Sequence, residues 1–206
     1  MAHLRSFRPG DEPALAEICL RTADTGSDAT GILDDDDIWG AVFVLPYVAR
    51  HPELAVVVET DDGRVAGYAV ATDDTDAFEE WFLSEWWPRF AQRWPKPVGE
   101  PATRQDSVLA YAYGRRPGAE PFAESFPAHL HIDLLPDVQG QGWGRGLITA
   151  LLERLRAAEV RGVHLVAAGT NAGAIAFYER LGFTRLDAPA DVAAFGMPVS
   201  RHPGVG

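Results

Sequence analysis

Residues 139–146 read QGQGWGRG, so four glycines occupy eight consecutive positions. Glycine loses more backbone freedom on folding than any other residue, and such a run is kept where a tight turn or a ligand needs bare backbone. The stretch before it, HLHIDLLP, alternates like a strand, and the stretch after it, LITALLERLRAAE, has its apolar residues at helical spacing. We therefore expect a turn that joins a strand over 129–135 to a helix over 147–159.

Two common anion-binding loops do not fit this turn. A Walker A loop ends in Gly-Lys-Ser/Thr, whereas Leu147 follows Gly146 here. The GxGxxG spacing of dinucleotide-binding loops fails as well, because Arg145 or Leu147 falls on its last position. The turn is therefore predicted to bind neither a nucleoside triphosphate nor a dinucleotide.

A third pattern, Gln-x-x-Gly-x-Gly, is satisfied by Gln139, Gly142 and Gly144. In such a turn consecutive backbone N–H groups point into one concavity, and the following helix adds its positive end. That geometry can hold a pyrophosphate without a lysine. Taken alone, the eight residues leave open whether the turn binds a ligand or only shapes the backbone.

A second motif, NAGAIAFYERLGF, covers residues 171–183. Together with the strand and QGQGWG it resembles the GNAT superfamily of acyl-CoA-dependent N-acetyltransferases, over about residues 129–186. The resemblance implies an α/β (α+β) fold with a mixed, mostly antiparallel sheet whose fourth and fifth strands splay apart. It further implies that acetyl-CoA lies in the gap and that its acetyl group passes to an unidentified amine by direct attack, without a metal.

The resemblance also implies roles for individual residues. The pantetheine arm would lie along Leu134 and Leu135 and bond the side chain of Asn171. Tyr178 would contact the cofactor and act as the general acid for the departing thiolate. The residues whose backbone would hold the pyrophosphate are Gln139, Gly140, Gln141, Gly142, Trp143, Gly144 and Arg145.

Two further stretches, WWPRFAQRWPKP and FPAHLHIDLLPDV, resemble the acetyltransferase-like domain appended to O-GlcNAc hydrolases. This resemblance implies a substrate contact for Asp24, within ADTG. Some members of that group have a degraded glycine turn, so the alternative function is a catalytically silent acetyl-CoA-binding or protein-interaction module. The turn of this chain is intact, which favours cofactor binding.

The strand HLHIDLLP contains the candidate base. Alternation places His129, His131 and Asp133 on one face and the apolar residues on the other. Near the acyl site, Asp133 could take a proton from the amine, directly or through water, or bind a cationic substrate. The alternative is a structural carboxylate. His131 is the second candidate for base or substrate contact, or it is a structural histidine.

The whole chain, residues 1–206, is predicted to form one domain with a helical and loop insertion at about 73–128. Within it, Trp81, Trp86, Trp87 and Trp94 form either a substrate wall or, more commonly for such a stripe, part of the core. The other expected elements are a strand over 3–7, a helix capped by Asp11, a helix over 38–49, a hairpin over 54–71, a helix over 78–94 broken at Pro88 and a short helix over 107–113.

Composition narrows the function classes. The net charge is −12 and no cluster of Lys or Arg is seen, so nucleic-acid binding is not expected. No apolar run has the roughly 20 residues of a membrane span, and the start lacks the apolar stretch of a signal peptide. A single cysteine, Cys19, provides neither a disulfide framework nor a thiolate metal cluster. A cytoplasmic protein is therefore predicted, with no membrane partner.

Overall fold

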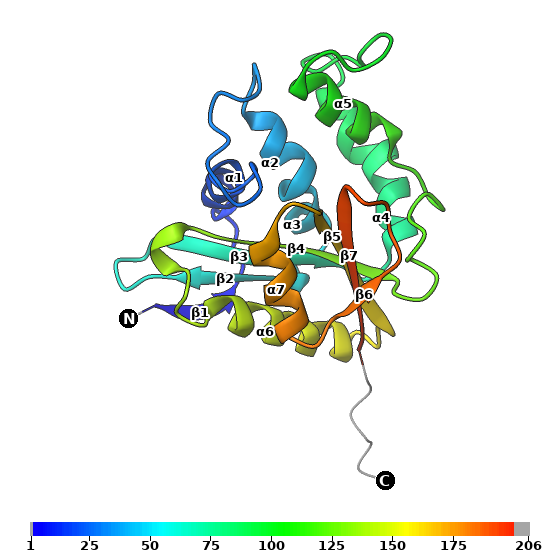
Figure 1. Cartoon of the computed structure of the whole chain (residues 1–206). Helices are drawn as coiled ribbons and strands as arrows, with labels where there is room; N and C mark the ends of the chain where they lie inside the picture. The colour runs from blue at the N-terminus through cyan, green and yellow to red at the C-terminus, as the bar shows by residue number, and fades with distance from the viewer. Residues whose placement is uncertain (1, 200–206) are drawn as a thin grey trace.

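The computed structural model describes residues 2–199, which form one seven-stranded sheet with helices on both faces (Figure 1). The strand order is β1-β2-β3-β4-β5-β7-β6, and only β4 and β5 run parallel. The mixed, mostly antiparallel sheet predicted from the sequence is thus confirmed. The strands are β1 (His3–Ser6), β2 (Ala55–Glu59), β3 (Val65–Thr72), β4 (Ala128–Leu134), β5 (Gly162–Ala168), β6 (Thr184–Leu186) and β7 (Val192–Pro198).

The helices divide between the two faces of the sheet. Helix α6 packs under β2, β3 and β4, whereas α1 and α3 cover the opposite face of β3 (Figure 1). The helices are α1 (Glu12–Leu20), α2 (Asp37–Phe43), α3 (Leu45–Arg50), α4 (Thr75–Trp81), α5 (Arg104–Gly114), α6 (Trp143–Ala157) and α7 (Ala172–Arg180). Short 3-10 turns cover Pro52–Leu54, Trp87–Phe90 and Pro136–Val138, and a π turn covers Phe82–Trp86.

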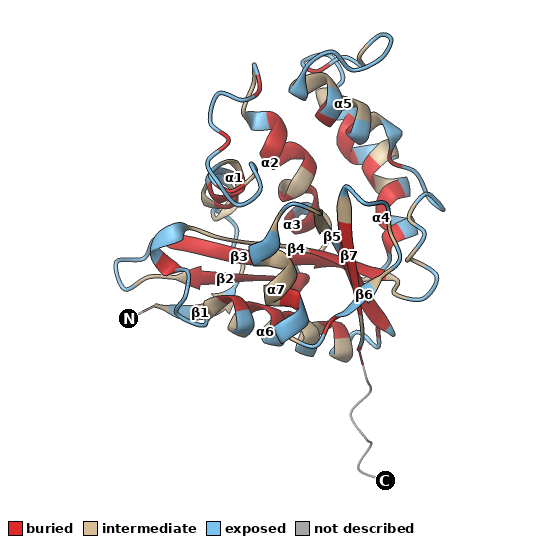
Figure 2. Ribbon diagram, viewed as in Figure 1, coloured by how far each residue is buried: buried red, intermediate tan, exposed pale blue. Residues whose placement is uncertain are grey.

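Burial of both sheet faces explains the continuous apolar run of β2. Val57 packs into the cluster beneath α1, α2 and α3, while its neighbours Val56 and Val58 pack into the cluster around α6. Figure 2 shows the same burial along β2 and β3. A strand with one wet face would alternate apolar and polar residues instead. The two clusters therefore fix the sheet between two layers of helices.

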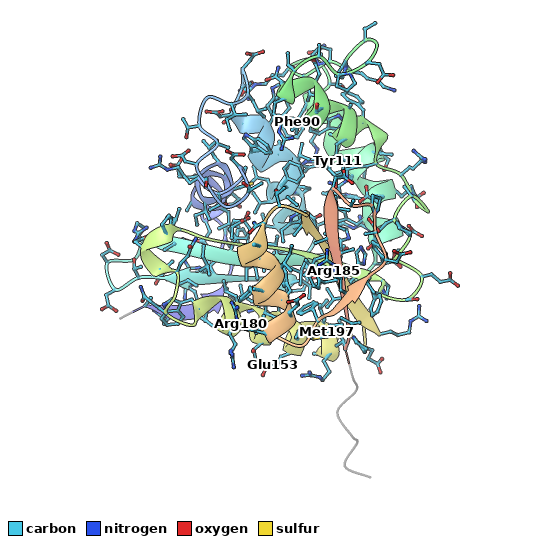
Figure 3. All side chains as sticks on the ribbon, viewed as in Figure 1. Phe90, Tyr111, Glu153, Arg180, Arg185 and Met197 are labelled. Atoms are coloured by element: carbon cyan, nitrogen blue, oxygen red, sulfur yellow. The ribbon has the colours of Figure 1, made fainter. Side chains whose placement is uncertain are left out.

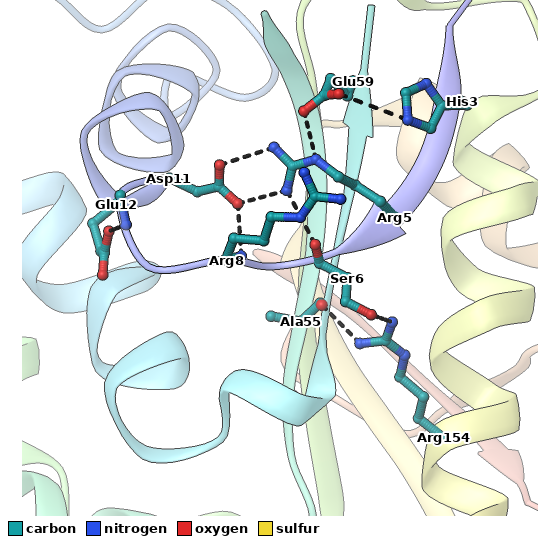
Figure 4. A network of polar contacts seen from close by, with 10 residues as sticks. His3, Arg5, Ser6, Arg8, Asp11, Glu12, Ala55, Glu59 and Arg154 are labelled. Carbon is teal, nitrogen blue, oxygen red and sulfur yellow. Dashed lines mark hydrogen bonds and ion pairs between the residues drawn. The ribbon is translucent and has the colours of Figure 1, made fainter. Parts of the chain in front are cut away.

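An arginine network ties β1 to α1 and to the rest of the sheet (Figure 4). Arg5 donates to Glu59 Oε2 at 2.5 Å and to both carboxylate oxygens of Asp11, at 2.7 and 2.9 Å. Asp11 stands at the N-cap of α1, as predicted, but its carboxylate accepts from Arg5 and from the backbone N–H of Arg8 rather than from helical amides. From α6, Arg154 donates to Ser6 Oγ of β1 at 2.8 Å and to Ala55 O of β2 at 2.7 Å. The N-terminal strand is therefore held by side chains as well as by the ladder.

Four helix predictions differ from the structure. The helix expected over 78–94 is α4 followed by the π turn over Phe82–Trp86 and the 3-10 turn over Trp87–Phe90, and it ends before residue 94. The helix expected over 38–49 is two helices, separated at Val44, because Pro46 lacks the N–H that would continue the ladder. The short helix expected over 107–113 begins at Arg104, because Thr103 and Asp106 form a capping box. The last glycines of QGQGWGRG belong to α6, which begins at Trp143 rather than at residue 147.

The sheet opens between β4 and β5. These two strands pair only through Ala128 with Val163 and His129 with His164, at the start of both strands. Beyond those pairs they diverge, and β1–β3 lie across the direction of β5–β7 in Figure 1. The predicted splay of the fourth and fifth strands is therefore confirmed, and it creates a gap along the C-terminal half of β4.

Candidate functional site

A cavity of about 890 Å³ fills the gap between β4 and β5. On one side, called here the turn side, it is lined by the glycine turn, the start of α6 and helix α7. On the other, called here the aromatic side, it is lined by Cys19, Thr22, Trp39, Phe43 and Arg104. The predicted site residues that line the cavity are His131, Asp133, Leu134, Gln139, Gly140, Gly142, Gly144, Arg145, Asn171 and Tyr178.

The glycine turn needs its glycines for two different reasons. Gly140 and Gly142 have φ values of +72° and +87°, in the left-handed region that favours glycine. Gly144 lies against α7, and a Cβ there would stand 3.0 Å from the ring of Phe177 and 3.4 Å from Leu134. The turn is thus shaped by backbone conformation at its start and by close helix packing at its end.

The N-terminus of α6 presents unbonded backbone donors beside the cavity. The first helical bond here runs from the N–H of Gly146 to Gly142 O, at 3.1 Å. The N–H groups of Trp143, Gly144 and Arg145 precede it, so the helix offers them no acceptor. These donors and the helix dipole together favour an anion.

Positively charged side chains outnumber negatively charged ones in the cavity lining, whereas the chain as a whole is acidic. Although the net charge is −12, the cavity is lined by Arg104, Arg145 and Arg180 against one carboxylate, Asp133. Arg180 stands at the end of α7 (Figure 3). The site therefore attracts an anionic ligand within an acidic protein.

Strand β4 turns two of its N–H groups toward the gap. The N–H of Leu135 bonds to Ala66 O on β3 at 2.9 Å, and alternation along an antiparallel strand then directs the N–H groups of Ile132 and Leu134 to the β5 side. There β5 is too far away to pair. The Leu134 carbonyl accepts from the Gln139 side chain at 2.8 Å. Two backbone donors thus face the cavity, while Leu135 bonds to β3.

Asn171 begins α7 and already uses both ends of its side-chain amide. Its Oδ1 accepts from Ala174 N at 3.0 Å, as an N-cap, and its Nδ2 donates to Thr25 O at 3.3 Å. Thr25 belongs to the loop after α1 and also lines the cavity. Asn171 therefore links the turn side to that loop.

Tyr178 lies seven residues further along α7 and is 7% exposed. Its ring packs against Phe177, Phe183 and Phe195, and no described residue hydrogen-bonds its hydroxyl. Burial raises the pKa of Tyr178, and the charge of Asp133 raises it further. The hydroxyl is therefore protonated at neutral pH.

Asp133 is half-buried on β4 and lines the cavity. It accepts a hydrogen bond from the hydroxyl of Tyr68 at 2.5 Å. Burial raises the pKa of Asp133 to about 6, with the Tyr68 hydrogen bond acting in the opposite direction. A carboxylate with this pKa is mostly ionised at neutral pH and is well matched to proton abstraction there.

His131, two residues earlier, lines the same cavity on the same face of β4. Its Nε2 lies 3.1 Å from the hydroxyl of Tyr47. Burial and, to a smaller extent, the charge of Arg115 lower the pKa of His131 to about 4. The imidazole is therefore neutral at physiological pH.

Several predicted residues lie outside the cavity. Asp24 is exposed, with its backbone bridged to Ser27, and only its neighbours in the loop line the cavity. The side chain of Gln141 donates to Asp137 O at 2.8 Å, and Trp143 packs against the α6 cluster. Of the four tryptophans in 81–94, Trp86, Trp87 and Trp94 are buried in the core, Trp81 packs against it, and none lines the cavity.

The aromatic side was not predicted from the sequence. Trp39 and Phe43 stand one helical turn apart on α2, with ring centroids 5.8 Å apart, and Arg104 lies over the Trp39 ring at 5.9 Å. The Trp39 indole is 4% exposed, and its N–H has no partner. In the sequence DIWGAVF the two aromatic residues are four positions apart, which places them on one face of a helix. The same spacing is typical of a helix that packs into the core, so it does not indicate a ligand site. Cys19, buried nearby, has a raised pKa through burial and is a thiol rather than a thiolate.

No helix within residues 2–199 has the length and apolar character needed to span a bilayer. In the same part of the chain, no three His, Cys, Asp or Glu side chains converge in a way that could hold a metal ion.

The opened sheet, the free helix N-terminus and the tyrosine and aspartate beside them form an α/β domain with titratable groups in its cleft. Comparison with known proteins identifies the class further. Residues 30–183 match the profile of the Acetyltransferase (GNAT) family, and the chain belongs to that family.

Curated relatives include two kinds of protein. The chain is 24% identical to Protein O-GlcNAcase of Rattus norvegicus over 87% of its own length and 20% of that protein. It is 30% identical to Mycothiol acetyltransferase of Nocardiopsis dassonvillei over 69% of its length and 47% of that protein. The chain thus spans less than half the length of these curated relatives.

Solved structures support the same family. SsHAT superposes with a TM-score of 0.93 at 37% identity, covering 97% of this chain and 99% of that chain. The yncA protein of Salmonella typhimurium, described with its cofactor acetyl-CoA, has a TM-score of 0.58 at 17% identity, covering 100% of this chain and 98% of that chain. The second likeness concerns the fold alone.

Proposed function

We propose that this protein transfers an acetyl group from acetyl-CoA to a primary or secondary amine by direct attack. The observation that carries the proposal is one cavity that contains the free N–H groups of α6, Tyr178 and Asp133 together. The N–H donors with Arg145 and Arg180 suit the phosphates of CoA, which supports placing the donor on the turn side. The acceptor then enters from the aromatic side.

In the proposed reaction, the lone pair of the neutral amine attacks the thioester carbonyl carbon, and Asp133 removes a proton from the nitrogen as the new N–C bond forms. The gap-facing N–H groups of Ile132 and Leu134 are the candidate donors to the oxyanion. As the carbon–sulfur bond breaks, Tyr178 gives its proton to the CoA thiolate. An N-acetylated amine and CoA thiol are the products, and solvent returns the proton from Asp133 to Tyr178.

The pantetheine arm is proposed to lie along Leu134 beside Asn171. The Asn171 amide bonds Thr25 O in the structure, so binding the arm through this side chain would require it to exchange that partner. Leu135 was also predicted to contact the arm, but it does not line the cavity, it packs against the cluster beneath α1, α2 and α3, and its N–H bonds to Ala66 O. A cytoplasmic location remains a prediction.

The test measures binding and turnover separately. Saturating acetyl-CoA should raise the melting temperature, because a ligand that binds only the native state stabilises it. CoA thiol release with a panel of amines should then show turnover, and Tyr178→Phe should lower kcat about 10²-fold or more without weakening acetyl-CoA binding.

The matched control is Tyr111→Phe, since Tyr111 lies on α5 with its side chain outside the cavity lining (Figure 3). An unchanged melting temperature would contradict the proposed binding of acetyl-CoA. Binding without CoA release across amines and peptides would instead identify a silent acetyl-CoA-binding module.

A further inference from the structure

Behind His131 runs a row of buried polar side chains. His131 Nε2 lies 3.1 Å from the Tyr47 hydroxyl, which lies 2.6 Å from Nε2 of His129. Nδ1 of His129 lies 2.8 Å from the hydroxyl of Thr75, which lies 2.7 Å from the carbonyl oxygen of Pro127. Thr75, Tyr47 and His129 are 2%, 1% and 9% exposed, so water does not take part in these bonds.

The end of this row fixes the position of every proton in it. A carbonyl oxygen can only accept a hydrogen bond, so the Thr75 hydroxyl donates its single proton to Pro127 O. Thr75 must then accept from Nδ1–H of His129, which leaves Nε2 of His129 without a proton. Tyr47 donates to that nitrogen, and its oxygen must therefore accept from Nε2–H of His131.

Both imidazoles are neutral, as this assignment requires. Burial lowers the pKa of His129 well below its usual range, and Arg115 acts in the same direction on both histidines. With the proton of His131 on Nε2, its Nδ1 carries a lone pair. No described residue bonds that nitrogen, and it is not sealed from the cavity that the ring lines.

The row cannot carry protons away from the site. Each hydroxyl or imidazole could pass a proton inward, but Pro127 O at the far end cannot release one to another group. Its physical effect is therefore to orient His131. Tyr47, His129 and Thr75 are positioning residues, and His131 is a hydrogen-bond acceptor of fixed direction.

We propose that Nδ1 of His131 accepts one N–H of the attacking amine while Asp133 takes another, so that the buried row behind His131 orients the amine nitrogen toward the thioester. The inference rests on the proposed function and deepens it. The two groups lie two residues apart on one face of β4, a spacing of roughly 6.6 Å along the strand. A nitrogen placed between them can bond both and keep its lone pair for the thioester.

The chemistry of the acceptor atom follows from the count of its hydrogens. A neutral primary amine has two N–H groups, one for each acceptor. A secondary amine has one, as do an alcohol and a thiol, so either His131 or Asp133 would be left without its partner. A buried acceptor without a donor costs about 1–3 kcal/mol, which is about 5- to 150-fold in kcat/KM.

The tautomers can be tested independently of turnover. In ¹⁵N-labelled protein, NMR should show a proton on Nδ1 of His129 and on Nε2 of His131, two opposite tautomers within one strand. His129→Gln and His131→Gln assign the signals. A proton on Nδ1 of His131 would overturn the inference, whether or not the protein acetylates any amine.

The role of the row is tested with Tyr47→Phe, which keeps the ring stacked on Phe78 at 4.5 Å but removes the hydroxyl. We expect wild type to favour a primary amine over its N-methyl form by at least about fivefold in kcat/KM, and Tyr47→Phe to reduce that preference to near unity. The control is Tyr113→Phe, which loses a comparable bond to Trp94 O at 2.9 Å and touches neither histidine.

The outcomes separate the two proposals. Equal use of primary and N-methyl amines by wild type, or a preference unchanged in Tyr47→Phe, would refute the role of His131 while leaving acetyl transfer intact. If wild type releases no CoA with any amine, the proposed function fails and the acceptor assignment fails with it. The NMR tautomers still decide whether the row orients His131.

Discussion

The two sides of the cavity are built in opposite ways. The turn side comes from neighbouring residues, since the glycine turn, the start of α6 and the start of α7 follow one another along 139–178. The aromatic side combines α1, α2 and the start of α5, which are far apart in sequence and meet through packing. Backbone geometry therefore shapes the first side and tertiary contacts shape the second. A ligand held by backbone can be predicted from a short motif, and one held by packed side chains cannot.

The largest effect is expected where the two sides meet, at Asp133. Asp133→Asn should lower kcat about 10²- to 10⁴-fold, because it removes the proposed base, and should leave acetyl-CoA affinity unchanged. In wild type, kcat/KM should fall as pH drops through about 6, since protonation of Asp133 abolishes the base. The groups facing it, Tyr68, Cys19 and Tyr178, are neutral in that range.

Asp34→Asn is the matched control, because Asp34 is an exposed carboxylate of the 34–37 run. It should change neither kcat nor the pH profile. Persistence of the limb near pH 6 in Asp133→Asn, with kcat intact, would assign the base to another group.

An intermediate effect is expected on the turn side. Gly142→Ala places a Cβ at φ +87° and should tilt the N–H groups of α6, so that acetyl-CoA affinity falls about tenfold. Gly63→Ala makes the same change at φ +82° in the β2–β3 turn, away from the cavity. Both substitutions should destabilise the fold by about 1 kcal/mol. Calorimetric titration showing equal loss of affinity in both variants would contradict a specific role for the turn.

The smallest effect is expected on the aromatic side. Trp39→Phe replaces a ring that lines the cavity with a smaller one and should raise KM for the amine about fivefold, because apolar contact with the acceptor is lost. Trp94→Phe removes an indole N–H that bonds Asp35 at 2.8 Å in the core. Both changes should lower the melting temperature, but only the first should change KM. A rise in KM for Trp94→Phe alone would reverse the assignment of the two tryptophans.

The turn side of the cavity could be predicted from the sequence to a greater extent than the aromatic side. The resemblance carried by the glycine spacing and NAGAIAFYERLGF was enough to place Gly142, Asn171 and Tyr178 at one cavity. The alternation of side chains along a strand placed Asp133 and His131 on the same face of β4. The bond between Tyr47 and His129 joins residues 82 positions apart, and no local pattern connects them. The start of α5, by contrast, had a readable signal in the capping box of Thr103 and Asp106.

The opening between β4 and β5 also bears on self-association of the protein in solution. Strands that stop pairing within a sheet present free N–H and C=O groups, and such edges can recruit strands of other chains. On β5 the exposed edge includes Val166, an apolar residue that is 47% exposed and lines the cavity. Residues of helix α7 line the cavity at this opening. The gap that admits a ligand is thus an additional edge inside the sheet, and an occupied gap should keep the protein monodisperse on storage as well as stable to heat.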